Sequence, residues 1–449
     1  MVARNDTIAA IATAPGRGGV AVIRVSGPDA FVVAERLTNK KPQVGRVQFV
    51  SFRGTDDRRQ APADPCGPLI LDEGLLLSFK APHSYTGEDV VEFQCHGGTV
   101  TPQRILAACL AAGARLARRG EFTERAFLNG KLALDQAESV LDLIDAKTER
   151  AADVALKGLT GQRDREAQTL YEQAIDISSE VEHALDIDES ELPESFLTSL
   201  AARVEELKDS LRSALVRARE GKILREGALV VLAGPPNAGK SSLMNALLGE
   251  HRAIVSEVAG TTRDSIEEWL DLDGWPVRLV DTAGLRETAD AIEAEGVRRS
   301  ERLIEKAAVV VELGSADAVR QPAADRREAT ITVVSKCDLL SASARRDATD
   351  SQRLFVSAKT GEGLDALKQA IVDKLVKRAE AFDEEQSMES RAAAYHEALS
   401  LLTSDAPAAD LVLLGNALHR ACEILGAEFG AVYSEDLLDR LFSRFCVGK

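Results

Sequence analysis

A glycine-rich segment in the middle of the chain combines residue types that hold phosphate groups. Residues 234–241 read Gly-Pro-Pro-Asn-Ala-Gly-Lys-Ser, which matches the pattern GxxxxGK(S/T) directly after an apolar run. In this pattern the glycines let backbone N–H groups curl around phosphate oxygens. Lys240 neutralises the β- and γ-phosphates, and Ser241 offers a hydroxyl to Mg²⁺. An ordinary glycine-rich turn is the alternative, but the apolar run before the segment and the helix-forming residues after it favour a phosphate-binding loop.

Two further polar segments carry residues that complete a phosphate site. Residues 260–264, Gly-Thr-Thr-Arg-Asp, lie in a polar stretch, where Thr262 could give Mg²⁺ a second hydroxyl. Residues 281–284, Asp-Thr-Ala-Gly, close an apolar run. There Asp281 can hold the Mg²⁺ shell, and the N–H of Gly284 can contact a γ-phosphate. Either segment alone is more often a solvated turn.

Two later motifs are typical of guanine recognition. In Ser-Lys-Cys-Asp, residues 335–338, Asp338 can accept hydrogen bonds from guanine N1 and N2 while Lys336 packs over the base. Residues 357–359, Ser-Ala-Lys, could complete the base pocket. Five motifs in this order predict a GTPase domain that binds GTP and Mg²⁺, with Lys240 and Gly284 acting in catalysis. The motif residues expected at the nucleotide are Asn237, Ala238, Gly239, Lys240, Ser241, Ser242, Thr262, Asp281, Thr282, Ala283, Gly284, Ser335, Lys336, Asp338, Ser357, Ala358 and Lys359.

Two positions depart from the usual pattern of such GTPases. The guanine motif usually begins with asparagine, and Ser335 is shorter, so guanine preference should persist through Asp338 with lower affinity. Leu285 stands where Ras-like proteins carry the glutamine that orients the attacking water, and leucine cannot do this. Another group must therefore place the water, and another cation must offset the transition-state charge. Asn237 could hold that cation, or it could simply favour the turn.

Short apolar runs alternate with helical segments around these motifs, which predicts a mostly parallel sheet with crossover helices. The runs are 228–233, 277–280, 308–313, 331–334 and 354–356. Before them, apolar runs predict strands of an α+β region at 20–25, 75–79 and 89–93, with a surface loop at 53–68.

Helical patterns flank the α/β region on both sides, so we expect it to be inserted into a helical domain. Apolar residues recur at helical spacing at Val204, Leu207, Leu211 and Leu215, and again at Leu414, Leu418, Cys422 and Leu425. Residues 186–194 form an acidic interruption, and Ser434 suits a further helix start. The expected parts are an N-terminal α+β domain (1–130), a first helical part (131–224), a G domain (225–376) and a second helical part (377–449).

Composition narrows the remaining classes. The chain has 449 residues, enough for about three domains, and its 45% hydrophobic content excludes a disordered protein. The net charge of −17 argues against a protein that coats nucleic acid, since such binding needs a cationic surface. The six scattered cysteines have no zinc spacing and predict free thiols in the cytoplasm. We expect no membrane span, because no apolar run approaches 18 residues, and no signal peptide.

The whole chain resembles the MnmE (TrmE) family, GTPases that help to modify the wobble uridine of tRNA. The Glu-Arg-Ala-Phe-Leu-Asn motif and the terminal Cys-Val-Gly-Lys are specific to that family. The segments that carry the resemblance are 6–9, 15–20, 23–27, 84–90, 96–98, 120–131, 234–241, 260–264, 281–287 and 445–449.

The resemblance implies a function for the N-terminal domain. In this family that domain dimerises and binds 5-formyltetrahydrofolate, at positions that match Arg24, Glu88, Lys131 and Lys449. Arginine and lysine suit the glutamate tail of a folate, and a carboxylate suits its amino-pterin edge. Cys446 matches the family's terminal cysteine and is a possible reactive thiol. The resemblance also implies a homodimer that joins the FAD protein MnmG in a heterotetramer and forms a 5-carboxymethylaminomethyl or 5-aminomethyl group on tRNA.

The resemblance further implies that K⁺ serves as the missing cation. Its ligand positions match Asn237, Ser256, the carbonyl of Val258, and Thr261, so Ser256 and Thr261 join the nucleotide site. Glu293 falls at the family's catalytic glutamate, which orients water through a bridging water. Without the family match, residues 290–295 are simply an acidic helix start, and it is the match that favours Glu293 over Glu295.

Three functions compete on this sequence. The first is K⁺-activated GTP hydrolysis that drives tRNA uridine modification. The second is an RNA-binding assembly switch without modification chemistry, which would need a basic module that the acidic charge disfavours. The third is a one-carbon folate enzyme with a regulatory G domain, which would turn over substrate without a partner.

Overall fold

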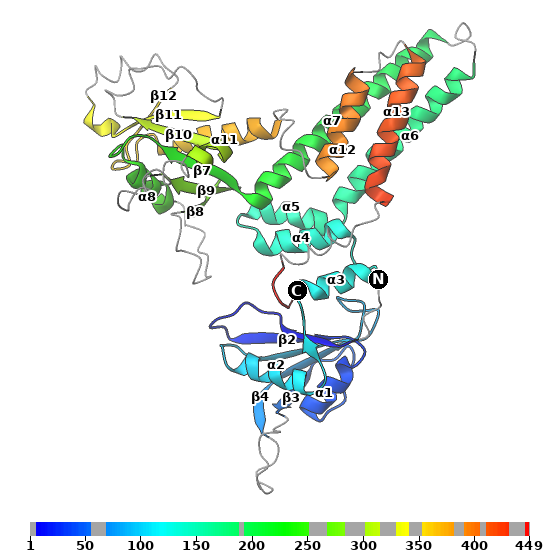
Figure 1. The fold of residues 1–449 in the computed structure, drawn as a ribbon, viewed down its shortest axis with the longest axis vertical. Helices are drawn as coiled ribbons and strands as arrows, with labels where there is room; N and C mark the ends of the chain where they lie inside the picture. The colour runs from blue at the N-terminus through cyan, green and yellow to red at the C-terminus, as the bar shows by residue number, and fades with distance from the viewer. Residues whose placement is uncertain are drawn as a thin grey trace. The chain divides into compact units, whose positions relative to one another are not determined.

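The computed structural model separates the chain into two compact units (Figure 1). It describes residues 6–54, 69–187, 193–250, 267–282, 301–314, 329–340, 353–380, 390–404, 410–430 and 445–448. One unit joins residues 1–141 to residues 432–449, and the other spans residues 142–431. Of the loop expected at 53–68, residue 53 ends a strand and residues 55–68 lie outside the described residues, as does the helix expected from Ser434.

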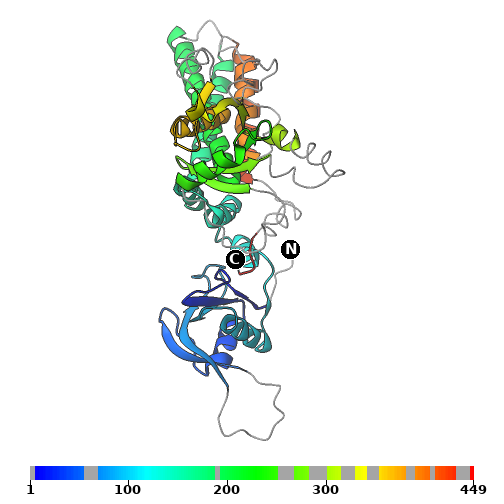
Figure 2. The same ribbon diagram turned by 90° about the vertical axis from the view of Figure 1, so that its left-hand side faces the viewer.

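The first unit is a mixed β-sheet with helices against one face (Figure 2). Its elements are β1 (Ile8–Ile11), β2 (Val20–Ser26), α1 (Ala30–Thr38), β3 (Gln48–Arg53), β4 (Ile70–Phe79), β5 (Val90–His96), α2 (Thr101–Ala111) and β6 (Arg115–Leu116). The strand order is β3-β4-β5-β2-β1-β6. Because side chains alternate along a strand, Val91, Phe93 and Cys95 of β5 all enter the core that α1 and α2 cover. The three strands expected here are confirmed in β2, β4 and β5.

The last described residues of the chain pack with this first unit. Two helices follow the sheet, α3 (Glu121–Leu128) and α4 (Leu134–Asp145). Phe445 is fully buried against Leu134 and Leu141 of α4. Its carbonyl accepts a hydrogen bond from Nε of Arg119 at 3.0 Å. The second helical part expected at residues 377–449 stays a prediction, and the compact units group residues 445–448 with the N-terminal sheet.

The second unit contains the expected α/β sheet. Its elements are β7 (Ala228–Ala233), α8 (Lys240–Glu250), β8 (Glu267–Leu272), β9 (Trp275–Asp281), β10 (Val309–Gly314), β11 (Thr330–Ser335), β12 (Arg353–Val356) and α11 (Leu364–Glu380). The strand order is β12-β11-β10-β7-β9-β8, and every neighbouring pair is parallel except β8 with β9. The five expected strands are confirmed. The sequence reading missed β8, because only Leu270 and Leu272 of its alternating pattern are fully apolar and buried.

The sheet is preceded and followed in the chain by helices, most of which pack together in a bundle (Figure 1). These helices are α5 (Glu149–Leu159), α6 (Gln162–Leu185), α7 (Glu194–Glu226), α12 (Ser390–Ser404) and α13 (Leu411–Gly430). The apolar positions expected on α7 and α13 lie in the shared core of α6, α7, α12 and α13. Gly227 alone separates α7 from β7, at φ +73°, where a Cβ would lie 2.3 Å from the ring of Trp269. Glycine therefore permits the direct passage from bundle to sheet.

Cys95, Cys109, Cys337, Cys422 and Cys446 are free thiols. Burial raises the pKa of Cys95 and of Cys422 to about 11, so both are protonated at neutral pH. Within the described residues, the helices are too short or too polar to cross a membrane.

We predict that the bundle depends on the buried side of α13. Leu414 is fully buried, whereas its chain neighbour Leu413 is 46% exposed. Leu414→Ala should lower the free energy of unfolding by about 2–5 kcal/mol, because it removes apolar contacts and leaves a cavity. The matched control Leu413→Ala should change it by about 0.5 kcal/mol or less. Urea titration followed by circular dichroism measures both, and equal losses would contradict the assigned faces of α13.

Candidate functional site

The segment between β7 and α8 forms a tight loop around the side chain of Lys240. Gly234 has φ +141°, and a Cβ there would lie 2.3 Å from the carbonyl oxygen of Leu313 in β10, so only glycine fits. The Lys240 ammonium is nearly buried and donates to the carbonyl oxygens of Gly234 at 3.0 Å and Pro235 at 2.9 Å. The loop therefore holds a cationic group at its centre, as a phosphate site requires.

A hydroxyl and a carboxylate meet beside this loop. The Ser241 hydroxyl donates to Oδ2 of Asp281 at 2.5 Å. The parallel register of β7 and β9 sets Leu232 opposite Asp281, which brings the end of β9 to the phosphate loop. Thr282 is anchored there, because its hydroxyl donates to the Leu232 carbonyl oxygen at 2.9 Å. Hard oxygen donors of this kind fit Mg²⁺.

The base motif is tied directly to the phosphate loop. The Ser335 hydroxyl donates to the carbonyl oxygen of Ala238 at 2.6 Å. Lys336 takes a left-handed φ of +56°, and its ammonium donates to the carbonyl oxygen of Asn237 at 2.9 Å. Its side chain thus passes over Gly239, whose added Cβ would lie 3.7 Å from Cε of Lys336. The shorter Ser335 therefore keeps a contact between base motif and phosphate loop that the sequence alone did not reveal.

The second guanine-recognition motif, residues 357–359, orients the aspartate that would read guanine. Ser357 is fully buried at the end of β12, and its hydroxyl donates to Oδ1 of Asp338 at 2.7 Å. Ala358 is half-buried and Lys359 is exposed beside it. Asp338 lies in a short 3₁₀ turn that follows β11. The structure thus brings the base residues Ser335, Asp338 and Ser357 to adjacent strand ends.

Several residues predicted for the site cannot be compared with the structure. They lie outside the described residues and stay predictions: Ser256, Val258, Thr261, Thr262, Ala283, Gly284, Leu285, Glu293 and Lys449. Of the expected K⁺ ligands, only Asn237 is described. It sits in the phosphate loop at a left-handed φ of +61°, which its short amide side chain tolerates.

A second polar cluster in the first unit contains three of the residues matched to the family's folate site. The ring of Tyr85 lies under the guanidinium of Arg24 at 5.2 Å, close enough for a cation–π contact. Lys131 donates through Nζ to the carbonyl oxygen of Pro82 at 3.1 Å, and its Cγ would lie 3.2 Å from a Cβ added at Gly87. Glu88 follows at once in the chain. Arg24 and Lys131 therefore both contact the segment 82–88, which ends in Glu88.

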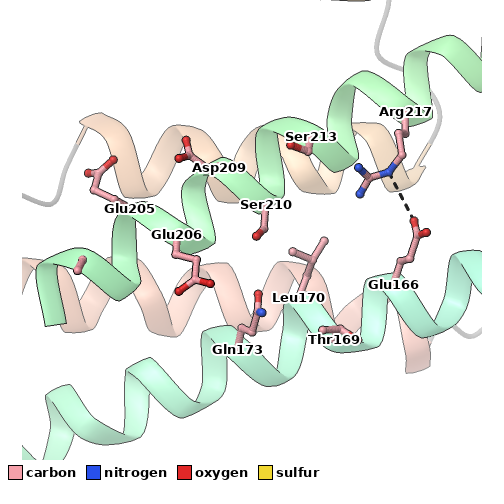
Figure 3. A pocket seen from close by; sticks show the side chains of 11 residues that line it. Glu166, Thr169, Leu170, Gln173, Glu205, Glu206, Asp209, Ser210, Ser213 and Arg217 are labelled. Carbon is pink, nitrogen blue, oxygen red and sulfur yellow. Dashed lines mark ion pairs between the residues drawn. The ribbon is translucent and has the colours of Figure 1, made fainter. Parts of the chain in front are cut away.

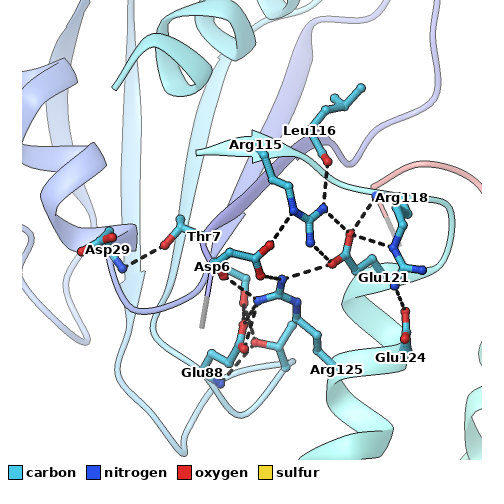
Figure 4. Close-up of polar contacts among 12 residues, drawn as sticks. Asp6, Thr7, Asp29, Glu88, Arg115, Leu116, Arg118, Glu121, Glu124 and Arg125 are labelled. Carbon is cyan, nitrogen blue, oxygen red and sulfur yellow. Dashed lines mark hydrogen bonds and ion pairs between the residues drawn. The ribbon is translucent and has the colours of Figure 1, made fainter. Parts of the chain in front are cut away.

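The sequence reading missed the residues that hold Glu88 in place. The Ser26 hydroxyl donates to Oε2 of Glu88 at 2.7 Å. Arg125 of α3 also donates to this carboxylate, and Figure 4 shows Arg125 between Glu88, Asp6 and Glu121. Both Glu121 and Arg125 are buried, at spacing i and i+4 on one helix. That spacing, inside a motif used only to mark the family, was the available signal.

Cys446 is exposed in the first unit. Its carbonyl oxygen accepts a hydrogen bond from the N–H of Gly120 at 3.4 Å. This contact holds the backbone of the terminal segment and leaves the thiol on the surface.

A cavity of about 790 Å³ lies between α6 and α7 (Figure 3). It is lined by the acidic residues Glu166, Glu205, Glu206 and Asp209, and by Arg217, which pairs with Glu166 at 3.6 Å. This cavity contains no residue of the nucleotide motifs.

The predicted nucleotide-binding motifs lie at the ends of strands. In chain order they are the phosphate loop, Asp281, which is expected at Mg²⁺, and the guanine motif. With a parallel sheet behind them, this is the arrangement of a Ras-like P-loop GTPase domain.

Comparison with known proteins extends this class to the whole chain. Residues 7–131 match the family described as GTP-binding protein TrmE N-terminus, and residues 134–446 match the MnmE helical domain. The tRNA modification GTPase MnmE of Azoarcus sp. (strain BH72) is 43% identical over 456 residues, covering 99% of this chain and 98% of that protein. The MnmE of Neisseria meningitidis serogroup B is 42% identical and covers 99% of each chain. The chain therefore belongs to the MnmE family of tRNA modification GTPases.

Among solved structures, the G domain of the T. maritima FeoB iron transporter is similar over a shorter stretch. It is 26% identical and covers 33% of this chain and 98% of that chain, with a TM-score of 0.24.

We predict that Ser335→Ala weakens nucleotide binding about tenfold. The change removes a hydrogen bond worth about 0.5–1.5 kcal/mol and leaves the Ala238 carbonyl without that donor, and 1.4 kcal/mol corresponds to tenfold in affinity. Thr330→Ala, at the other end of β11, is the matched control and should leave affinity unchanged. Fluorescence titration with a labelled GDP measures both variants. Wild-type affinity in Ser335→Ala would show that the tie to the phosphate loop does not support binding.

Proposed function

We propose that this protein hydrolyses GTP and couples hydrolysis to modification of the wobble uridine of tRNA. Its partner would be the FAD protein MnmG, and the product a carboxymethylaminomethyl or aminomethyl group at C5. The observation that supports this proposal is the contact set at one sheet edge, where Lys240, Ser241 and Asp281 lie together beside the base motif, as a phosphate and Mg²⁺ site would require. Relatives over the full length of the chain are named as tRNA modification GTPases.

Hydrolysis in this site needs a cation other than an arginine finger. Lys240 and Mg²⁺, held by Ser241 and Thr262, would offset charge on the phosphates. K⁺, held by Asn237, Ser256, Val258 and Thr261, would supply the remaining positive charge in the transition state.

Water must also be placed without the usual glutamine. Leu285 has no polar atom in its side chain, so Glu293 would orient the water through a second water. The N–H of Gly284 would contact the γ-phosphate as charge develops there.

The first unit would bind 5-formyltetrahydrofolate. Arg24 and Lys131 contact residues 82–88, which include Glu88, and Lys449 directly follows in sequence the described segment 445–448 that packs in the same unit. Cationic side chains suit the tail of a folate, and the Glu88 carboxylate suits its amino-pterin edge. Cys446 would be a reactive thiol in this terminal segment.

The assembly that we propose is a cytoplasmic homodimer that joins MnmG in a heterotetramer. Residues 1–130 would form the folate-binding and dimerisation domain and residues 225–376 the G domain. Residues 131–224 and 377–449 would form the two helical parts. Pairing of the G domains would close the loop 256–261 around K⁺, so that the rate of hydrolysis would depend on assembly.

An assembly switch that binds RNA without modifying it is the alternative. Such a protein would bind tRNA without modifying it, and cells that lack the protein would still carry the modified wobble uridine.

We predict that Lys240→Ala abolishes the modification in cells, because the phosphate charge then lacks its partner. Mass spectrometry of wobble uridine would be performed on a deletion strain carrying wild type, Lys240→Ala, or the exposed α11 control Lys377→Ala. Wild type and Lys377→Ala should restore the modified base, and Lys240→Ala should not. If the deletion strain still contains the modified wobble uridine at the wild-type level, the assembly switch is favoured. Full modification with Lys240→Ala would show that modification does not depend on hydrolysis.

We predict that GTP turnover is at least several-fold faster in K⁺ than in Na⁺ at equal ionic strength. Na⁺ is smaller and should fit the same oxygen ligands poorly. Asn237→Gly keeps the left-handed backbone at φ +61° and removes only the amide, so it should abolish K⁺ stimulation.

Asn39→Gly is the matched control for this experiment. Asn39 is also left-handed, at φ +54°, but ends α1 in the other unit, so its variant should keep full stimulation. Equal rates in both salts, or stimulation that survives Asn237→Gly, would exclude this role of K⁺.

A further inference from the structure

We infer that Arg125, together with Ser26, is a positioning residue that clamps the Glu88 carboxylate for recognition of the pterin edge of a folate. The inference rests on the folate site proposed above and adds to it two residues that do not themselves touch the ligand. Arg125 lies on α3 and Ser26 ends β2, so the clamp closes on Glu88 from two separate elements.

The guanidinium of Arg125 is a hub for three carboxylates (Figure 4). Nη1 donates to both oxygens of Glu88, each at 3.1 Å, and to the main-chain oxygen of Asp6 at 2.9 Å. Nη2 donates to Oδ1 of Asp6 at 2.7 Å and to Oε1 of Glu121 at 3.1 Å. Because its donors have a fixed planar arrangement, the positions of Asp6 and Glu121 determine where Nη1 points, and hence where Glu88 is held.

The hub itself is rigidly placed. The side chain of Arg125 is 4% exposed and that of Glu121 is 0% exposed. Burial opposes the charge of Glu121, but hydrogen bonds from Arg115, the N–H of Arg118 and Arg125 outweigh it and lower the pKa of Glu121 to about 2. The carboxylate therefore stays ionised and anchors both arginines across the neutral pH range.

Glu88 differs from the other two carboxylates of the hub in what it can reach. Its side chain is 20% exposed, and it is the last residue of the segment 82–88 that Arg24 and Lys131 contact. The Ser26 hydroxyl, which is also 2.7 Å from the Thr86 hydroxyl, holds its Oε2 from the sheet side. The Glu88 carboxylate is thus held by Arg125 and Ser26, while part of its side chain remains exposed.

A fixed carboxylate matches the chemistry of a pterin edge. That edge presents a ring N–H and an exocyclic amine side by side, and an ionised carboxylate accepts from two such donors at once. A glutamate side chain that is already immobilised loses less conformational entropy when the ligand binds. The clamp should therefore strengthen binding through the exocyclic amine in particular.

Lysine in place of Arg125 would keep the charge but not the geometry. A single ammonium lacks the planar fork that joins Glu88 to Asp6 and Glu121. Arg125→Lys should therefore release Glu88 while preserving the net charge of the cluster. Arg118→Lys is the matched control, because Arg118 is 47% exposed, and its guanidinium pairs with Glu124 at 2.6 Å and at the longer distance of 3.6 Å with Glu121.

The experiment is calorimetric titration of the full-length protein with 5-formyltetrahydrofolate and with an analogue that lacks the exocyclic 2-amino group. Wild type and Arg118→Lys should prefer the amino ligand. Arg125→Lys should lose about tenfold in affinity for that ligand and nearly nothing for the analogue. Ser26→Ala leaves the arginine hub intact and should also lose affinity for the amino ligand relative to the analogue, by a smaller factor. Thermal unfolding curves identify any variant that is not folded, in which case Ser26→Ala decides.

The outcomes distinguish the clamp from the folate site itself. No binding by wild type would refute the proposed folate site. Binding by wild type that Glu88→Gln weakens, with preference intact in Arg125→Lys and Ser26→Ala, would overturn the clamp alone. Equal loss for both ligands in Arg125→Lys would also overturn it, since that result indicates a merely structural role. A double variant Glu88→Gln with Arg125→Lys should bind no more weakly than Glu88→Gln, and independent losses would contradict the coupling.

Discussion

The parallel pairing of β7 with β9 and β10 is the constraint on which the nucleotide site depends. Parallel strands end at the same edge of a sheet, so residues that are far apart in sequence meet there. The register sets Leu232 opposite Asp281, and this pairing brings the Asp281 carboxylate to the Ser241 hydroxyl. A shift of β9 by one residue would turn Asp281 to the opposite face and separate the two groups.

The same edge explains why the phosphate and base halves of the site act as one structure. β11 and β12 continue the parallel sheet, so Ser335 and Ser357 reach the edge on adjacent strands. From there Ser335 and Lys336 donate to carbonyl oxygens of the phosphate loop itself. The loop is therefore supported from the base side as well as by its own glycines. These hydrogen bonds would couple the phosphate loop to the base motif when a nucleotide binds.

The first unit uses a different principle, in which charges are held in place by other charges. Arg125 would be costly to bury alone, and Asp6, Glu88 and Glu121 together offset that cost. The consequence is a group of side chains with little freedom to move. Such a group suits a surface that must discriminate a small ligand by the direction of its hydrogen bonds.

The sequence by itself determined the nucleotide motifs, the alternation of strands and helices behind them, and the inserted order of the parts. These features are local: a glycine at the phosphate loop, or an apolar run that ends in Asp281, can be read from neighbouring residues alone. Only the tertiary structure decided that Ser335 supports the phosphate loop, that Phe445 packs in the first unit, and that Arg125 holds Glu88. Each of these contacts joins residues separated by dozens to hundreds of positions, and spacing along the chain carries no information about a partner that folding alone brings near.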